Sequence, residues 1–126
     1  MASRPLSPHI TIWKWGPHML TSILHRATGD GMAFVGLPIL AWWLAALASG
    51  PDAYAVFAKQ ASSWYGIIIL VGVSWAFFNH MSSGIRHLVL DMGAGYELDT
   101  NKAGSILSIA SGIILTAAFW AALILL

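Results

Sequence analysis

The chain has 126 residues, of which 58% are hydrophobic and only 9% are charged. A soluble domain carries roughly 25% charged residues, so the composition argues against a water-soluble enzyme and against a disordered tail. The formal net charge of +1 offers no basic surface for a nucleic acid. The sequence contains no cysteine, which excludes Cys-ligated zinc and iron–sulfur clusters within it and leaves five histidines as candidate ligands for a transition metal.

The charged residues leave three uninterrupted charge-free runs, over residues 31–51, 60–85 and 103–126. At about 1.5 Å per residue, a helix of some 20 residues crosses the roughly 30 Å hydrocarbon core of a bilayer. We therefore predict an all-α membrane protein, a single domain with a polar arm over residues 1–20 and helices over about 21–49, 61–90 and 103–126. Residues 51–59 are expected to be a plain connector, and residues 92–102 a Gly-rich acidic loop.

The cations are distributed unevenly between the two predicted sides of the membrane. Only Lys59 falls in the first connector, whereas five cations fall on the other side: Arg4, Lys14, Arg26, Arg86 and Lys102. The positive-inside rule then places the N-terminus in the cytoplasm and the C-terminus outside. Residues 1–9 lack the apolar core of a signal peptide, so we expect them to be retained. A multi-pass protein of a bacterial inner membrane fits best, with a mitochondrial inner membrane as the less favoured setting.

Two features inside the predicted helices bear on packing. Pro38 removes a backbone donor and predicts a kink in the first helix. Gly104, Ser108 and Gly112 follow one another at four-residue spacing in the third helix. Small residues in this rhythm permit close helix packing, either within the chain, which we favour, or against another subunit.

A first polar cluster, Ser22 and Arg26, stands at the membrane edge. The two side chains are at i and i+4, so they share one face if the helix has begun there. A hydroxyl beside a guanidinium makes a pair of donors suited to a carbonyl, a carboxylate or a phosphate. The alternative is that Arg26 extends to lipid headgroups while Ser22 bonds its own helix backbone.

A second cluster forms one stripe along the second helix, since its members stand at i, +3, +4, +7 and +11: His80, Ser83, Gly84, His87 and Asp91. His80 lies deep enough in the span to need a partner. A neutral imidazole with one free nitrogen is a good iron ligand, and Gly84 would leave room for a flat macrocycle. Ordinary packing of His80 is the alternative. Asp91, near a helix C-terminus, requires a compensating cation, for which Arg86 or His87 would serve.

These clusters, together with residues 4–9 (RPLSPH), resemble the cytochrome b anchor subunit of succinate dehydrogenase, respiratory complex II. The matching segments are residues 22–26 (SILHR) and 80–93 (HMSSGIRHLVLDMG), in the same order and at similar separation. Leu90 departs from the family, in which many members carry an aromatic residue or Met before the aspartate. The departure affects local packing only.

The resemblance implies three transmembrane helices that pair with a second hydrophobic anchor and share a haem b with it. His80 matches the axial iron ligand, Ser22 and Arg26 match residues that line the ubiquinone site, and His25 and Arg26 lie where the family contacts haem propionates. His87 is a further candidate for that outer contact, and Asp91 for a charge partner. A flavoprotein and an iron–sulfur subunit would complete the complex, so the chain itself would hold no FAD and no iron–sulfur cluster and would perform no succinate chemistry.

Two alternatives to a succinate:ubiquinone reductase anchor remain at this point. One is the anchor of a fumarate reductase that works in reverse with a quinol. The other is a structural membrane subunit, or a transporter subunit, in which His80 merely packs and no redox cofactor is bound.

Overall fold

The computed structural model describes residue 12 and residues 14–125, and this part of the chain contains helices and loops but no strand. Three of its helical stretches are long and apolar enough to cross a membrane: Pro17–Ser49, Trp64–Asp91 and Leu98–Leu125. The predicted all-α membrane fold is thereby confirmed. The arm motif at residues 4–9 lies outside the described residues, as does Trp13.

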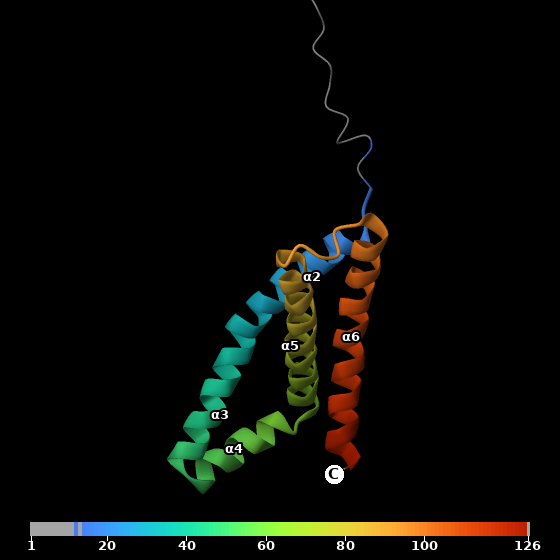
Figure 1. Cartoon of the computed structure of the whole chain (residues 1–126). Helices are drawn as coiled ribbons and strands as arrows, with labels where there is room; N and C mark the ends of the chain where they lie inside the picture. The colour runs from blue at the N-terminus through green and yellow to red at the C-terminus, as the bar shows by residue number, and fades with distance from the viewer. Residues whose placement is uncertain (1–11, 13, 126) are drawn as a thin grey trace, which may run out of the picture.

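The first span consists of two helices joined by a short π-helical segment. α2 (Pro17–Gly31) begins with proline in its first turn, four residues before the predicted start, and passes through η1 (Met32–Gly36) into α3 (Leu37–Ser49). Pro38 has no N–H to donate, and in η1 the Leu37 N–H bonds the Met32 carbonyl, five residues back. The chain changes direction where α2 passes into α3 (Figure 1), as the predicted kink at Pro38 requires.

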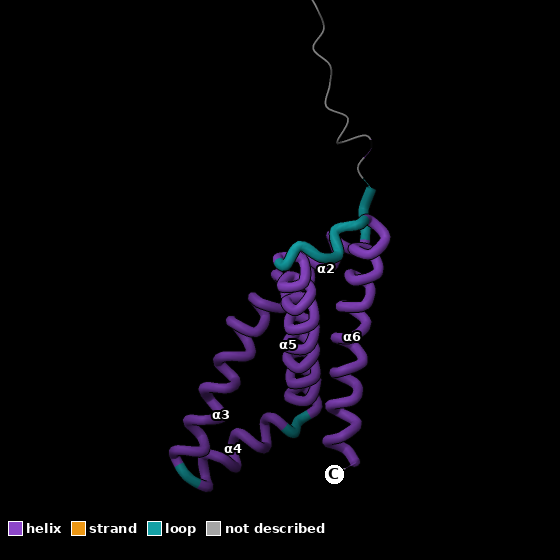
Figure 2. The backbone as a smooth tube through the Cα atoms, viewed as in Figure 1, coloured by secondary structure: helices purple, strands orange, loops and turns teal. Residues whose placement is uncertain are grey.

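The segment expected to be a plain connector is a helix, α4 (Pro51–Ala61). Gly50 precedes it with φ of 104°, a backbone conformation that favours glycine, and Pro51 then fits the first turn. Asp52 in the first turn and Lys59 in the last both complement the helix dipole. α4 joins the far end of α3 to the start of α5 (Figure 2).

The other two spans are α5 (Trp64–Asp91) and α6 (Leu98–Leu125), which lie side by side along their length (Figure 1). The Ser63 hydroxyl caps α5 by accepting from the Gly66 N–H at 3.1 Å. α6 begins at Leu98, within the segment expected to be a loop.

Small polar side chains are buried on both of these spans, against each other or against α2. They are Ser82 and Ser83 on α5, and Ser105, Ser108 and Thr116 on α6. Those hydroxyls that form hydrogen bonds donate to carbonyls of their own helices, as Ser108 does to Ser105 at 3.0 Å, so they can be buried. The large apolar side chains are mostly exposed instead, including Phe34, Trp64 and Leu107. This inverted distribution is what a lipid solvent favours.

Gly112 brings the α5 and α6 backbones together. A Cβ built on Gly112 would lie 2.8 Å from Asn79 Cα, so no larger residue fits without separating the helices. At Gly104 a Cβ would lie 3.7 Å from Arg86 Nε, an ordinary contact within the same helix pair. The small-residue rhythm of α6 therefore serves packing within the chain, as favoured above.

Candidate functional site

His25 and Thr28 of α2 meet the polar stripe of the second span where α2 crosses the C-terminal half of α5. The meeting point is near the end of the molecule that also carries the loop between α5 and α6 (Figures 1 and 2). Thr21 and Thr28 are the buried residues of α2, and His25 lies between them at helical spacing. One face of α2 therefore carries Thr21, His25 and Thr28 toward the rest of the chain.

His25 contacts several residues of the polar stripe on α5. Its Nδ1 lies 2.7 Å from the Ser83 hydroxyl oxygen. Its ring stacks on that of His80, with centroids 3.8 Å apart and planes at 14°, and meets the His87 ring edge-on at 5.1 Å. A Cβ on Gly84 would lie 3.9 Å from His25 Cε1. The space beside Gly84, which was expected to accommodate a macrocycle, therefore lies next to the His25 ring.

A hydrogen bond from Nδ1 of His80 ties this residue to α2. This atom lies 3.0 Å from the main-chain oxygen of His25, with the Thr28 hydroxyl oxygen at 3.4 Å. A carbonyl oxygen can only accept, so Nδ1 carries the proton and Nε2 keeps a free lone pair. Within the described part of the chain, Nε2 has no hydrogen-bond partner. His80 is half-buried. These are the properties that a histidine ligand to a metal requires.

Ser22 and Arg26 lie on a different face of α2 from His25. Each follows Thr21 or His25 by one residue, which rotates it by about 100° around the helix. Both side chains are exposed, and neither forms a hydrogen bond or ion pair with the described residues. The predicted donor pair is thus exposed and unpaired among the described residues. His25 and Arg26, grouped as propionate contacts in the sequence, face different surroundings.

Asp91 and Arg86 do not form the charge pair expected from the sequence. Arg86 Nη2 donates to Asn101 Oδ1 at 2.8 Å and so ties the end of α5 to the start of α6. Asp91 is exposed and has no cation partner among the described residues. His87 is also exposed and contacts His25 rather than Asp91. The arginine was available to Asp91 in sequence, but its helix face points to α6.

Sequence reasoning missed two residues at this crossing and one at the contact between α5 and α6. Thr28 and Gly29 follow His25 at i+3 and i+4, a spacing that could have placed them on the same helix face. Asn101 carries no such signal, because its contact with Arg86 depends on how α6 returns alongside α5.

No group of three or more His, Cys, Asp or Glu side chains that could hold a metal ion occurs among the described residues. Among the described residues, His80 is the histidine best prepared to bind a metal. His25 cannot be its counterpart, because two stacked rings 3.8 Å apart cannot place nitrogens on opposite sides of one iron.

Comparison with known proteins fits this geometry. The sequence profile of the succinate dehydrogenase/fumarate reductase transmembrane subunits matches residues 2–125. The chain belongs to this family. The succinate dehydrogenase cytochrome b556 subunit of Paracoccus denitrificans is 37% identical over 113 residues, which cover 90% of this chain and 86% of that protein. The subunit of the same name from Rickettsia felis is 38% identical over 117 residues, covering 93% and 90% of the two chains.

A more distant relative is the mitochondrial succinate dehydrogenase cytochrome b560 subunit of Sus scrofa, 31% identical over 99 residues, or 77% of this chain and 58% of that one. The expected resemblance to the cytochrome b anchor subunit of succinate dehydrogenase is confirmed. All three of these relatives carry succinate dehydrogenase names, so the fumarate reductase alternative is not favoured. This anchor subunit is a multi-pass membrane protein.

Proposed function

We propose that this succinate dehydrogenase anchor subunit binds haem b through His80 and lines a ubiquinone-reduction site with Ser22 and Arg26. The observation that carries the haem assignment is the bond from His80 Nδ1 to the His25 carbonyl, which leaves Nε2 as a free donor to a metal. The names of the cytochrome b556 relatives support the same cofactor. A bound haem would supply one-electron chemistry and a place to hold an electron between carriers.

The residues around His80 fit a haem on chemical grounds. His80 offers a neutral imidazole on α5, and the exposed His87 and Arg26 offer donors for propionates at the same end of the molecule. The second axial ligand would come from the second hydrophobic anchor subunit. This arrangement explains why a chain with a single well-oriented ligand can still belong to a cytochrome.

Ser22 and Arg26 would act on the quinone as hydrogen-bond donors. Both are exposed on α2 and free of partners in the described chain. Directed at a quinone carbonyl oxygen, a hydroxyl and a guanidinium would orient the ring and stabilise the negative charge that grows on that oxygen during reduction. The headgroup contact weighed above for Arg26 is the competing assignment, and the quinone assays described below distinguish the two.

The iron–sulfur and flavoprotein subunits would dock at the end that carries the α5–α6 loop and the start of α2. Among the described residues, all cations except Lys59 belong to that end, and by the positive-inside rule it would be the cytoplasmic one in a bacterial inner membrane. His80 lies on the half of α5 that α2 crosses, and Ser22 and Arg26 lie on α2 itself. Electrons from a peripheral iron–sulfur subunit would therefore arrive close to both proposed sites.

The test of the haem assignment is a dithionite-reduced minus oxidised spectrum of the detergent-solubilised complex. His80→Ala should diminish or shift the b-type signal, because it removes the ligand. His18→Ala is the matched control, since His18 is exposed in the first turn of α2, away from the His80 contacts. An unchanged spectrum in His80→Ala, with subunit content preserved, would rule out His80 as the ligand. A complex without any b-type signal would favour the purely structural alternative.

A further inference from the structure

We propose that Gly29 and the main-chain carbonyl of His25 are a positioning element for His80, which sets the angle of its ring and its strength as an electron donor. We call the His25 carbonyl, the Thr28 hydroxyl and the Gly29 Cα the His80 seat. The inference rests on the proposed haem function, and its tests are chosen so that the two can fail separately.

The first part of the seat fixes the proton on His80. Thr28 Oγ1 lies 2.7 Å from the Leu24 carbonyl and 3.1 Å from that of His25, so its own proton is directed to main-chain oxygens. The Thr28 oxygen is left to accept. The His80 Nδ1–H therefore faces two acceptors, the His25 carbonyl at 3.0 Å and Thr28 Oγ1 at 3.4 Å. Both favour the tautomer that frees Nε2.

The second part of the seat is the missing side chain of Gly29. A Cβ at this position would lie 2.9 Å from His80 Cε1, closer than real Cβ atoms approach their neighbours, and 3.3 Å from Nδ1, which is also a tight contact. Glycine is less favourable than alanine inside a helix. Gly29 stands within α2, where glycine destabilises the helix. The close approach of the His80 imidazole, which glycine allows, offsets this loss of helix stability.

The ring of His25 holds His80 from a further side. It stacks on His80 at 3.8 Å, and its own Nδ1 is anchored 2.7 Å from Ser83 Oγ. The Ser83 hydroxyl has carbonyl acceptors at 2.8 Å on Asn79 and 3.1 Å on His80, so its oxygen can accept from His25. Ser83 on α5 thus holds the His25 ring of α2 in place, and with it the stacked pair of His25 and His80.

A ligand held in this way has properties that an unrestrained histidine lacks. Hydrogen bonding from Nδ1–H to an acceptor raises the basicity of Nε2 and fixes the ring orientation. A more basic axial ligand stabilises the ferric state, so loosening the seat should raise the reduction potential of the bound haem. It should also alter the low-spin ferric EPR signal, which is sensitive to the orientation of the axial ring.

The main test compares Gly29→Ala with Gly31→Ala in the intact complex. Both place alanine in the same helix, but a Cβ on Gly31 meets nothing within 4 Å. We expect Gly31→Ala to match the wild type. Gly29→Ala should raise the haem midpoint potential and shift the EPR signal, or lose the haem from an assembled complex. If Gly29→Ala assembles and matches Gly31→Ala in potential and EPR signal, the seat is refuted.

A second pair decides the matter if Gly29→Ala does not assemble. Ser83→Ala removes the anchor of the His25 ring without adding volume, and Ser74→Ala removes from α5 a hydroxyl that bonds only the Leu70 carbonyl. We expect Ser83→Ala to broaden or shift the EPR signal and Ser74→Ala to leave it unchanged. Equal signals in the two variants would overturn the restraint of His80 by its α2 neighbours.

The proposed function and this inference are separated by His80→Ala. If that variant loses the b-type spectrum while Gly29→Ala and Ser83→Ala match their controls, His80 is the ligand but has no positioning element. If His80→Ala keeps the wild-type spectrum, the ligand assignment itself fails, and the seat fails with it.

Discussion

Arg26 and His25 are sequence neighbours with opposite surroundings. His25 is engaged by Ser83, His80 and His87, whereas Arg26 is exposed and unpaired among the described residues. An arginine at the membrane edge without a partner among the described residues is suited to bind lipid, a neighbouring subunit or a substrate. This choice can be tested directly on the quinone reaction.

Replacing the donors should impair quinone reduction selectively. A hydrogen bond from a charged donor is worth about 1.5–3 kcal/mol, so losing one in the transition state slows a reaction roughly 10- to 150-fold. We expect Arg26→Leu to reduce succinate:quinone activity within that range and Ser22→Ala to reduce it less. Succinate oxidation by a soluble dye should be unaffected. Ser49→Ala, an exposed hydroxyl at the far end of α3, is the control. A parallel loss of both activities would indicate defective assembly instead.

The polar stripe of α5 could be predicted from the sequence, but the residue that it contacts, His25, could not. Helical spacing alone puts His80, Ser83, Gly84 and His87 on one face. That all four approach His25 depends on how α2 crosses α5, which no local pattern encodes. The same limit explains Arg86: its charge suggested Asp91 as a partner, yet its helix face points to Asn101.

At the scale of elements, α4 is the clearest difference from the sequence prediction. Its signals were present: Gly50 before Pro51, an acidic residue in the first turn and Lys59 in the last. They were outweighed by the long apolar runs on either side. The 11 residues of α4 are too few to span a bilayer, but they determine where α5 starts relative to the end of α3.

Gly112 is a point of close approach between α5 and α6. Gly112→Ala would place a Cβ 2.8 Å from the Asn79 backbone, and such overpacking typically costs about 1–3 kcal/mol. We expect a lower thermal midpoint for the purified complex, although alanine is the better helix former. Gly104→Ala is the control on the same helix, because its Cβ would meet Arg86 Nε at 3.7 Å. Equal midpoints for the two variants would contradict this packing role.

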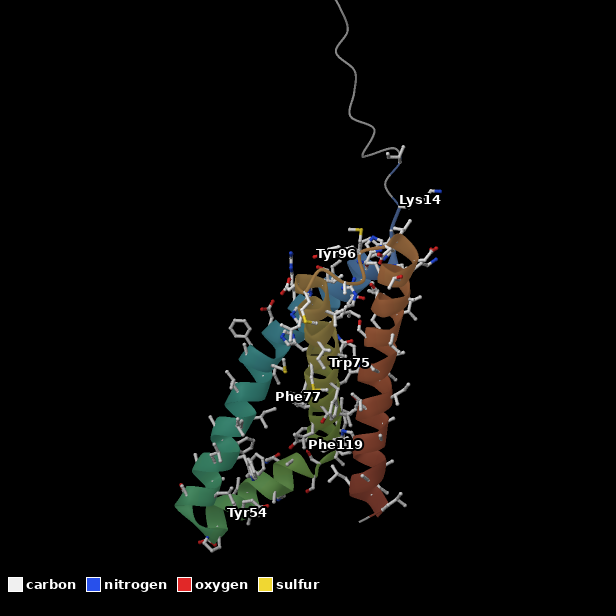
Figure 3. The ribbon with its side chains drawn as sticks, in the orientation of Figure 1. Lys14, Tyr54, Trp75, Phe77, Tyr96 and Phe119 are labelled. Carbon is white, nitrogen blue, oxygen red and sulfur yellow. The ribbon has the colours of Figure 1, made fainter. Side chains whose placement is uncertain are left out.

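At the scale of the whole molecule, the ends of the helices sort into two groups. The start of α2, the loop after α5 and the start of α6 lie together, and α4 lies at the opposite end with the end of α6 (Figures 1 and 2). Tyr96 and Lys14 mark the first end and Tyr54 the second (Figure 3). Among the described residues, the cations favour the first end, Lys59 being the exception.

Reporter fusions should therefore give opposite results at two glycines. Fused after Gly50, alkaline phosphatase should be active, because its disulfides form in the periplasm, and green fluorescent protein should be dark. Fused after Gly95, the two reporters should show the reverse. Each reporter thus serves as its own control at the other site. Phosphatase activity after Gly95 with none after Gly50 would mean that the chain is inserted the other way round.

The sequence by itself determined the class of molecule, the three spans and the chemistry available at each position. These properties follow from composition and from a helical period that local residues repeat. Only the tertiary structure decided which polar groups meet, such as His80 with the carbonyl of His25 and Arg86 with Asn101. It also decided where backbones come close, as Gly112 does to Asn79. In a bilayer, unpaired polar groups are costly, so such pairings are strongly favoured, but they join segments up to 55 residues apart that only the packing of helices can bring together.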